Sequence, residues 1–297
     1  MIIVKLTYGL ANQMFQYAAA KALALRNGQQ LKLDLSFFAS NDTQKLIHER
    51  YGLSLFKGID DRSVLSVEEI GKIRNRYESA LLFRSLNKVT KYMGLKARYE
   101  YCWEREFLKI DSAILQKKAR ILYLTGYFQN EVYFADYTDE IRKDLVFRPE
   151  LLDNYNLSLA KNMQKKESVS IHIRRGDYVG NRFVAPLSYY REAIAYLDSK
   201  LSDLEFYIFS DDPSWVKENM PTENNYFFIN HNTGEESYKD MYLMTQCKHN
   251  IIANSSFSWW GGWLNDNKDK IVVSPKEWLP EKGVMAIDIV PITWIKL

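Results

Sequence analysis

The stretch SVSIHIRRGDYVGNRFVAPLSYYREAIAYLDSKLSDLEFYIFSDD, residues 168–212, decides the fold. It begins with a short apolar run, passes through a segment whose apolar side chains recur at helical spacing, and ends in a second apolar run rich in aromatic residues. Two short apolar runs separated by a helical segment indicate parallel strands joined by a crossover helix. The stretch therefore predicts a βαβ unit.

The same alternation continues to the C-terminus. The predicted elements are a helix over 213–220, a strand over 226–231, a helix over 235–247, a strand running into a loop over 250–256, a helix over 257–265 and a strand over 270–275. Strands that alternate with helices in this way predict a doubly wound parallel sheet for the C-terminal half.

A similar pattern opens the chain. Residues 1–6 are a predicted strand, the turn YGLANQ follows over 8–13, and residues 14–28 show helical spacing that ends at a glycine before another strand, 31–35. Between about residues 40 and 120 no clean period appears, and we expect helices and loops there. The polar stretch over 154–168 is the best candidate for a boundary between two halves.

The composition limits the class of protein. The 297 residues carry a formal net charge of +3, so we expect no nucleic-acid partner. The two cysteines lie far apart and indicate neither a disulfide framework nor a metal site. The N-terminal run lacks the features of a signal peptide, and no apolar run is long enough for a spanning helix. We therefore expect a cytoplasmic protein whose contact with the inner membrane, if any, is peripheral.

Polar residues follow three of the predicted strands. They are Arg174, Arg175 and Asp177 after the first, Asp211 and Asp212 after the second, and Asn254, Ser255 and Ser256 after the third. Ligands of such sheets bind at the carboxyl ends of the strands, so we expect these residues to converge on one crevice. Paired arginines fit a phosphate, and Ser255 with Ser256 offers hydroxyl and N–H groups at a positive helix end.

Each of these residues also has a purely structural interpretation. An arginine can pair with Asp177, Ser255 can simply cap a helix, and Asp212 before a proline fits an N-cap as well as a ribose or guanine contact. His172 shares a strand face with Arg174, and it is either a nucleotide ligand or a core histidine. Trp259, Trp260 and Trp263 are expected to pack in the core rather than against a sugar.

The sequence contains no Asp-x-Asp, and its four histidines are scattered, so the usual ligand patterns for a diphosphate-bound metal are missing. Arginine would then supply the positive charge. The N-terminal turn precedes a helix, and we expect its backbone, with Asn12 and Gln13, to approach the donor or the acceptor from the other lobe.

Six blocks of the sequence, in this order, resemble the bacterial α-1,2-fucosyltransferases of glycosyltransferase family eleven. They are YGLANQMFQYA, GYFQNEVYF, SIHIRRGDYV, FSDDPSWV, HNTGEESYKDMYLM and IIANSSFSWWGGWLN. The blocks are spread over nearly the whole chain. Where many relatives carry Gly-Gly-Leu-Gly-Asn-Gln, this chain has Tyr8 and Ala11 in place of glycines, and the extra side chains are expected to narrow the acceptor side.

The resemblance implies an α/β, GT-B-like fold of two Rossmann-type lobes with parallel sheets and a nucleotide-sugar crevice between them. Residues 1–160 would form the acceptor-side lobe and residues 161–297 the lobe that binds the GDP-sugar. It implies GDP-β-L-fucose as donor, no metal, no separate cofactor, and inverting transfer to the 2-hydroxyl of a terminal β-galactose on an oligosaccharide or glycolipid in bacterial surface glycan synthesis. It also implies that Arg174 holds the β-phosphate, that His172 and one of Asp211 or Asp212 hold the guanosine, and that Ser255, Ser256 and Phe257 hold the phosphate or the base.

The expected mechanism is direct displacement at the anomeric carbon. Arg174 would stabilise the departing GDP, and Asp177 is the nearest candidate in sequence for a general base, although it could instead only orient an arginine. Two alternatives stay open: a transferase for another GDP-sugar or linkage, and a non-catalytic carbohydrate-binding protein.

Overall fold

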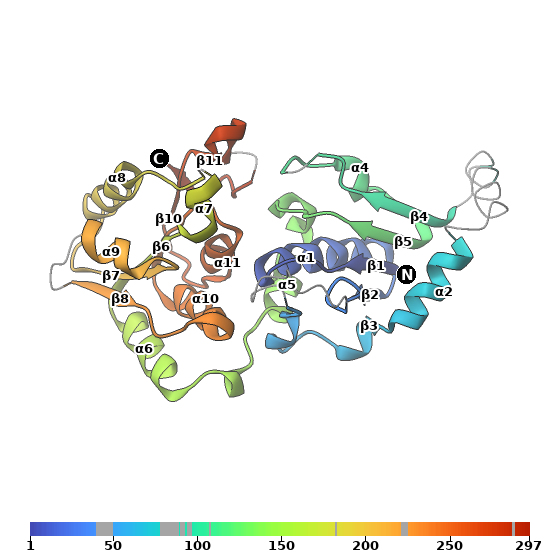
Figure 1. Cartoon of the computed structure of the whole chain (residues 1–297), viewed down its shortest axis with the longest axis horizontal. Helices are drawn as coiled ribbons and strands as arrows, with labels where there is room; N and C mark the ends of the chain where they lie inside the picture. The colour runs from blue at the N-terminus through green and yellow to red at the C-terminus, as the bar shows by residue number, and fades with distance from the viewer. Residues whose placement is uncertain are drawn as a thin grey trace. The chain divides into compact units, whose positions relative to one another are not determined.

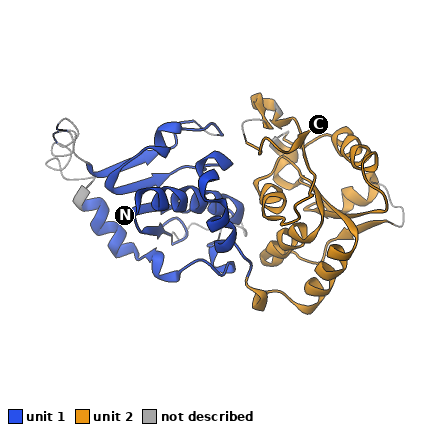
Figure 2. Cartoon of the chain, turned by 180° about the vertical axis from the view of Figure 1, so that it is seen from behind, with its two compact units in different colours: residues 1–147 blue, residues 148–297 orange. Residues whose placement is uncertain are grey.

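A computed structural model of the chain describes residues 1–39, 50–77, 89, 93, 97–106, 108–181, 183–220, 225–286 and 289–297. The chain divides into two compact units, Met1–Phe147 and Arg148–Leu297, which Figure 2 shows in blue and orange. Each unit is built around its own parallel sheet with helices packed against it (Figure 1). The α/β architecture with two Rossmann-type units that we predicted is confirmed.

The sheet of unit 1 has the strand order β3-β2-β1-β5-β4. Its strands are β1 (Ile2–Lys5), β2 (Leu31–Asp34), β3 (Val64–Leu65), β4 (Ala97–Trp103) and β5 (Ala119–Thr125), and the described helices of the unit are α1 (Leu10–Asn27), α2 (Val67–Tyr77), α4 (Ser112–Leu115) and α5 (Thr138–Asp144). Helix α1 ends at Gly28, which adopts a left-handed backbone with φ 60°. A left-handed residue after the last turn favours glycine, so this predicted end is confirmed.

Unit 2 contains the sheet that residues 168–212 predict, with the strand order β13-β10-β9-β6-β7-β8. Its strands are β6 (Glu167–Ile173), β7 (Leu204–Ser210), β8 (Tyr226–Ile229), β9 (His249–Ile251), β10 (Val272–Ser274) and β13 (Ile295–Lys296), and β11 (Glu277–Leu279) pairs with β12 (Val284–Met285) in a separate hairpin. Its helices are α6 (Asn154–Lys165), α7 (Gly176–Asn181), α8 (Leu187–Asp198), α9 (Pro213–Asn219), α10 (Tyr238–Gln246) and α11 (Ser256–Leu264).

Strand β7 shows why both faces of this sheet are covered. Phe206 and Ile208 pack into a core with α8 and α9, whereas Tyr207 and Phe209 pack into a second core with α6 and α10. Side chains alternate along a strand, so a strand that is apolar at every position must be buried on both faces. Figure 1 shows α8 and α9 on one side of β6 and β7, with α10 and α11 on the other.

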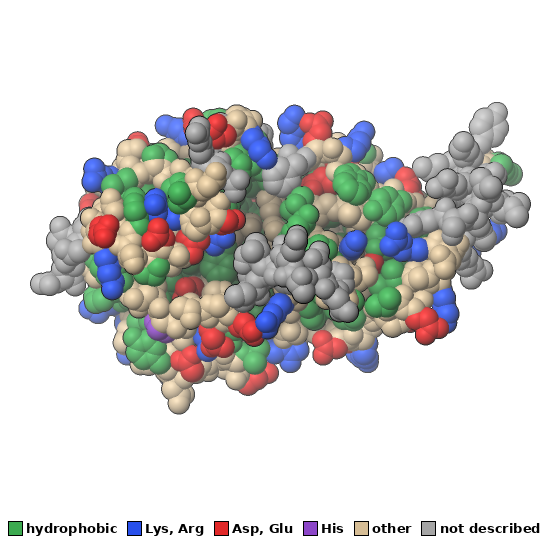
Figure 3. All heavy atoms as spheres, in the orientation of Figure 1, with side chains coloured by type: hydrophobic (Ala, Val, Ile, Leu, Met, Phe, Trp, Pro, Cys, Tyr) green, Lys and Arg blue, Asp and Glu red, His purple; other side chains and the backbone are tan. Residues whose placement is uncertain are grey.

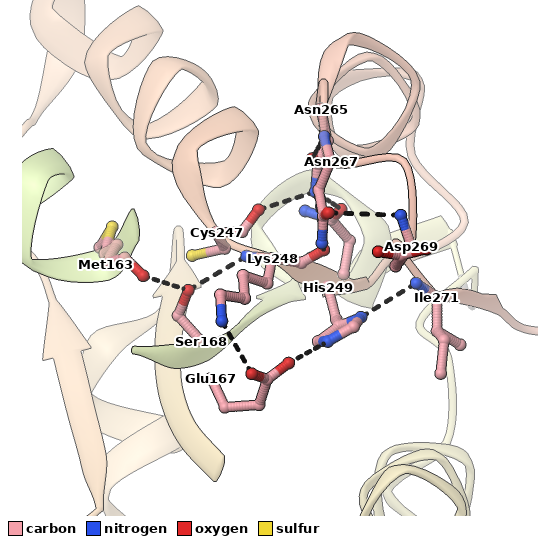
Figure 4. A network of polar contacts seen from close by, with 11 residues as sticks. Met163, Glu167, Ser168, Cys247, Lys248, His249, Asn265, Asn267, Asp269 and Ile271 are labelled. Atoms are coloured by element: carbon pink, nitrogen blue, oxygen red, sulfur yellow. Dashed lines mark hydrogen bonds and ion pairs between the residues drawn. The ribbon is translucent and has the colours of Figure 1, made fainter. Parts of the chain in front are cut away.

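A polar network closes the amino ends of β6 and β9 (Figure 4). Glu167 accepts hydrogen bonds from Lys248 Nζ at 2.8 Å and from His249 Nε2 at 2.7 Å, and His249 Nδ1 accepts the Ile271 N–H at 3.0 Å. Since Nδ1 is an acceptor, this buried ring is neutral and its proton sits on Nε2. The network ties strands together at the edge of the sheet away from the strands' carboxyl ends.

Two predictions about organisation are wrong. The stretch 154–168 is not the boundary between the halves, because most of it is α6, which Asp153 caps through the Asn156 N–H at 2.9 Å, and the division between the units comes earlier, after Phe147. The region from about 40 to 120 is not made of helices and loops alone, because it contains β4. Along β4 the burial alternates residue by residue over most of its length, which is a strand period that the charged neighbourhood obscured.

Candidate active site

The carboxyl ends of β9, β6 and β7 lie side by side, because these three strands are parallel neighbours. The chain leaves β6 for β7 on one side, and β9 and β10 lie on the other side, so β6 and β9 flank a topological switch point. Ligands of doubly wound sheets bind at such a point, where the loops after neighbouring strands separate. The three strand ends therefore lie at one edge of the sheet, and the crevice on which we expect their residues to converge stays a prediction.

Arg174 follows β6 and bridges two carboxylates. Its Nη2 lies 2.6 Å from Asp177 Oδ1 and its Nη1 lies 2.9 Å from Asp211 Oδ2. The guanidinium carbon lies 5.5 Å from the centre of the Tyr178 ring. The side chain of Arg174 is 28% exposed and that of Asp177 is 52% exposed, so both can be reached from solvent. The predicted alternative, an ion pair with Asp177, is therefore present in the structure.

Arg175 is held differently from its neighbour. Its guanidinium carbon lies 3.9 Å from the centre of the Trp215 ring, and its Nε lies 3.0 Å from Asp212 Oδ2. Asp212 also caps α9 by accepting the Trp215 N–H at 3.1 Å, and the hydrogen bond from Arg175 holds the pKa of this carboxyl below its usual range. The N-cap interpretation of Asp212 is confirmed. Arg175 packs against α9, the helix that Asp212 caps.

Asp211 connects the two arginines. Its Oδ1 accepts the Arg175 backbone N–H at 2.8 Å while its Oδ2 pairs with Arg174. A Cβ added at Gly176 would lie 2.6 Å from Asp211 Oδ2, so the close approach of this carboxylate requires glycine. In total, two guanidinium groups face three carboxylates in this cluster, which gives a formal net charge of −1.

His172 lies two residues before Arg174, on the same face of the strand, and is buried. Burial lowers the pKa of its imidazole to about 4, so the ring is neutral at pH 7. Its centroid lies 5.7 Å from that of Phe257, on the first turn of α11. The neutral ring carries one donor and one acceptor nitrogen, which suits a hydrogen bond to a nucleoside.

The loop after β9 joins the same edge. Tyr178 Oη donates to the Asn254 carbonyl at 3.2 Å, and Asn254 Nδ2 donates to two backbone carbonyls at 2.7 Å each. Ser255 Oγ accepts the Phe257 N–H at 3.3 Å and so caps α11, while Ser256 is the first residue of that helix. Capping of α11 by Ser255 is confirmed, and it leaves phosphate contact as a prediction.

Three buried polar atoms around this edge have no hydrogen-bond partner among the described residues. They are His172 Nδ1, Asn254 Oδ1 and Tyr190 Oη, the last from α8. Tyr190 interacts electrostatically with both Asp211 and Arg175, which places it beside the cluster. Buried polar groups in proteins are almost always paired, so the unpaired atoms of residues near the carboxyl ends of β6 and β9 favour a polar ligand at this edge.

Asn12 and Gln13 belong to unit 1. Asn12 Oδ1 accepts from Gln129 Nε2 at 2.5 Å. Gln13 is fully buried, with its Nε2 bonded to the Tyr8 and Arg50 carbonyls and its Oε1 accepting the Gly52 N–H. The amide of Gln13 thus holds the loop after β1 in place, and its contact with a donor stays a prediction.

The sequence placed Gly176 after the strand without giving it a role, and it did not single out Trp215 or Tyr190 as parts of this site. Trp215 lies three positions after Asp212 and Gly176 directly follows Arg175, and their roles depend on contacts with residues of the neighbouring strand end. Tyr190 lies inside an ordinary helical pattern and carried no signal. The predicted core role of Trp259, Trp260 and Trp263 is confirmed by their burial.

Among the described residues, no group of three or more His, Cys, Asp or Glu side chains is arranged to hold a metal ion. In the same part of the chain, no helix is long and apolar enough to cross a membrane. Lys, Arg, Asp and Glu side chains are interspersed over the face shown in Figure 3.

The chain matches the family described as "Glycosyl transferase family 11" over residues 1–297. It is 36% identical to the Escherichia coli O-antigen biosynthesis glycosyltransferase WbnK over 98% of this chain and 99% of the relative. It is 33% identical to the Escherichia coli alpha-1,2-colitosyltransferase over 100% and 98% of the two chains. The crystal structure of NodZ alpha-1,6-fucosyltransferase with GDP has the same fold, with a TM-score of 0.52 and 14% identity over 88% of this chain and 91% of NodZ. With the family matched along its whole length and both parallel-sheet units in place, this chain belongs to glycosyl transferase family 11 and has a GT-B-like fold.

Proposed function

We propose that this chain is an inverting α-1,2-fucosyltransferase that moves L-fucose from GDP-β-L-fucose to the 2-hydroxyl of a terminal β-galactoside in bacterial surface glycan synthesis. The observation that carries the proposal is Arg174, a solvent-accessible guanidinium at the switch point of the unit 2 sheet, held between two carboxylates. Membership in family 11 supports glycosyl transfer, and the name of the colitosyltransferase supports an α-1,2 linkage. The NodZ structure with GDP supports a guanine nucleotide donor.

Arg174 can serve the diphosphate without leaving Asp211. A guanidinium has more N–H donors than the two carboxylates use, and a bidentate fork matches phosphate oxygens. Because its orientation is fixed by Asp211 and by Tyr178, little reorganisation is needed when negative charge develops on the departing GDP. An interaction accelerates the reaction only if it is stronger in the transition state than in the ground state, and an interaction with the developing charge on GDP meets this condition.

In the proposed reaction, the acceptor 2-hydroxyl oxygen bonds to the anomeric carbon of fucose as the bond from that carbon to the diphosphate breaks. The hydroxyl proton passes to the Asp177 carboxylate, and the bonding pair leaves with GDP. Asp177 is exposed enough to meet an acceptor, and its contact with Arg174 couples the base to the leaving-group partner. Attack opposite the leaving group inverts the anomeric centre.

The nucleoside contacts follow from the buried polar edge. His172 Nδ1 and Tyr190 Oη offer unpaired groups, and Asp211 offers a carboxylate beside them. Phe257 presents a ring next to His172 for the base. We propose that Ser255 and Ser256 approach the phosphate from the start of α11, whereas Arg175 and Asp212 mainly support the site through Trp215.

A second donor is favoured by one observation. The chain is 33% identical to an alpha-1,2-colitosyltransferase, and colitose differs from fucose only in lacking the 3-hydroxyl. The loss of one hydroxyl group from the transferred sugar requires few changes in the residues of the donor site, so GDP-colitose is the second candidate donor.

The decisive experiment is product analysis. The full chain is incubated with GDP-fucose or GDP-colitose and a panel of β-galactosides, and the new linkage is located by NMR. We expect an α-1,2-fucosyl product. Turnover of GDP-colitose alone would assign the second donor, and GDP binding without any sugar transfer would assign a carbohydrate-binding protein instead.

We also expect the same activity in excess EDTA. In the proposed reaction, Arg174 stabilises the negative charge of the departing diphosphate, which a divalent cation does in other transferases. Initial rates are compared with and without the chelator. Complete loss of activity in EDTA that manganese restores would contradict this part of the proposal.

A further inference from the structure

The carboxyl edge of the unit 1 sheet carries a cluster of aromatic side chains. Phe37 follows β2, Tyr8 follows β1 and Tyr127 follows β5, and these three strands are neighbours in the sheet. The Tyr8 and Tyr127 rings are stacked at 5.3 Å with an interplanar angle of 8°, and the Phe37 ring is tilted against Tyr8 at 5.4 Å. We call these three side chains the aromatic platform. Its position within unit 1 is where the parallel sheet would present a ligand.

Tyr8 is the most accessible part of the platform. Its side chain is 38% exposed, and its backbone has φ 61°, in the left-handed region that glycine favours. A tyrosine in that region costs of order 1 kcal/mol or more and persists only when surrounding contacts impose it. Such strain is unusual for a bulky residue, and strained residues cluster at functional sites, so it favours a functional role for the Tyr8 ring.

The contacts that impose this conformation lie directly beneath the platform. Gln13 Nε2 donates to the Tyr8 carbonyl at 2.7 Å. Gln16 accepts the Thr7 N–H at 2.9 Å and donates to the Gly126 carbonyl at 3.0 Å, so it ties the residues before Tyr8 and Tyr127 to each other. The platform is therefore anchored on both sides by buried amides.

A buried carboxylate fixes the Tyr127 side. Glu104 accepts the Tyr127 N–H at 2.7 Å and the Phe128 N–H at 3.1 Å, and burial raises the pKa of this carboxyl above its usual range. A Cβ at Gly126 would lie 2.5 Å from Glu104 Cβ, so the close packing needs glycine there. The Glu104 carboxyl and the Gln16 amide together hold the loop after β5 against the loop after β1.

Neutral hydrogen-bonding groups lie close in sequence to the platform residues, on the first turn of α1 and in the segment after β5. Asn12, four residues after Tyr8, accepts from Gln129, two residues after Tyr127. A pyranose ring has an apolar face of C–H groups and a rim of neutral hydroxyls. An accessible aromatic ring next to amide groups matches both features, and an amphipathic, rigid tyrosine gives such contact at low entropic cost.

We propose that the aromatic platform binds the pyranose ring of the acceptor, with Tyr8 as the residue that determines acceptor specificity. This inference rests on the proposed function, because it takes the acceptor to be a β-galactoside. The groups placed for a charged diphosphate belong to unit 2, whereas the platform and its amides suit an uncharged sugar. Tyr8 contacts the acceptor and takes no part in donor binding.

Three variants separate the ring from the fold. Tyr8→Gly removes the ring and adopts φ 61° without strain, so the backbone is kept. Tyr8→Phe keeps the ring. Phe227→Ala is the matched control. Phe227 lies on β8 of unit 2, is 39% exposed, and stacks on the Tyr207 ring with 5.0 Å between the ring centroids and an interplanar angle of 21°.

The probe is lactose, whose terminal sugar is a β-galactoside. Its binding to each protein is measured by saturation-transfer NMR without donor, and its KM is measured with GDP-fucose. In Tyr8→Gly we expect the lactose Kd and KM to rise at least about tenfold while the donor KM stays within about twofold. Tyr8→Phe and Phe227→Ala should bind lactose like the unchanged chain.

The two readouts distinguish failure of the inference from failure of the proposed donor. Lactose binding that is lost in Tyr8→Gly supports the platform even if GDP-fucose is not turned over. Normal lactose binding and KM in a folded Tyr8→Gly protein would overturn the inference while leaving fucosyl transfer intact. Absence of lactose binding and transfer by the unchanged chain would also overturn it.

Discussion

Arg174 and Arg175 show how far identical neighbouring residues can differ in role. The first is held between Asp177 and Asp211 and is 28% exposed, whereas the second is 17% exposed and stacks on Trp215. Successive residues after a strand point in different directions, so the two guanidinium groups meet different partners and the first is the more exposed of the pair. The sequence placed both arginines in the donor site and at least one of them on a phosphate, but a motif records spacing and not which neighbour each side chain meets.

At the residue scale, Asp177→Asn separates two interpretations of that carboxyl. If Asp177 accepts the acceptor's proton, we expect kcat to fall by about 100-fold or more, and the acidic limb of the pH profile of kcat/KM to disappear. GDP affinity should be unchanged or higher, because the variant removes one of three carboxylates from the cluster. Steady-state kinetics and calorimetry with GDP measure both effects.

A folded Asp177→Asn protein with normal kcat and tighter GDP binding would show that Asp177 only neutralises Arg174. Asp269→Asn is a suitable control, because Asp269 lies in the network at the amino ends of the strands and is remote in the sheet from the candidate site (Figure 4).

At the scale of elements, the sequence located the strand ends well. The apolar runs before Arg174 and Asp211 are buried on both faces, so their ends could be read directly from the pattern, and parallel strands bring those ends to one edge. Strand β4 was missed because its alternating pattern is short and lies in a charged segment in which no clean period appears. The polar residues of α6 were taken for the boundary between the halves, because its apolar positions are few among polar ones.

The contact between α6 and α10 gives a prediction about pH. Asn232 Nδ2 donates to Asp240 Oδ1 at 2.8 Å and to Asn156 Oδ1 at 3.0 Å, and burial raises the pKa of Asp240 to about 7. A carboxyl whose pKa is raised on folding binds its proton more tightly in the folded state. Its stabilising effect is therefore complete below the ordinary pKa of 3.8 and is lost as the pH rises through about 7.

We expect the unchanged chain to lose about 2 to 3 kcal/mol of stability from this group between pH 5 and pH 8. Asp240→Asn cannot ionise and should show a flatter dependence of Tm on pH, with the larger gain at pH 8. Thermal melts of both proteins across this range provide the measurement. Parallel pH curves for the two proteins would show that Asp240 is ionised in the fold throughout.

At the scale of the whole molecule, the family match extends over both units, although the signature residues that the sequence made most prominent lie in unit 2. The fold class could be predicted because alternating apolar runs and helical segments admit few arrangements. The buried polar residues could not be predicted, since Glu104 and Gln16 in unit 1 and Tyr190 in unit 2 interact with residues far apart in sequence. Such buried polar residues have no periodic signal of their own.

The most direct test of the account compares Arg174→Lys with Arg175→Lys in the full chain, by kcat, donor KM and Tm. Both variants keep the charge and lose the planar fork, so they differ only in which arginine is changed. We predict that Arg174→Lys lowers kcat by about 100-fold or more with little change in Tm, because donors to the departing GDP are lost. Arg175→Lys should mainly lower Tm, because the stacking on Trp215 is lost. A well-folded Arg174→Lys protein with near-normal kcat would contradict the central claim that Arg174 stabilises the leaving group.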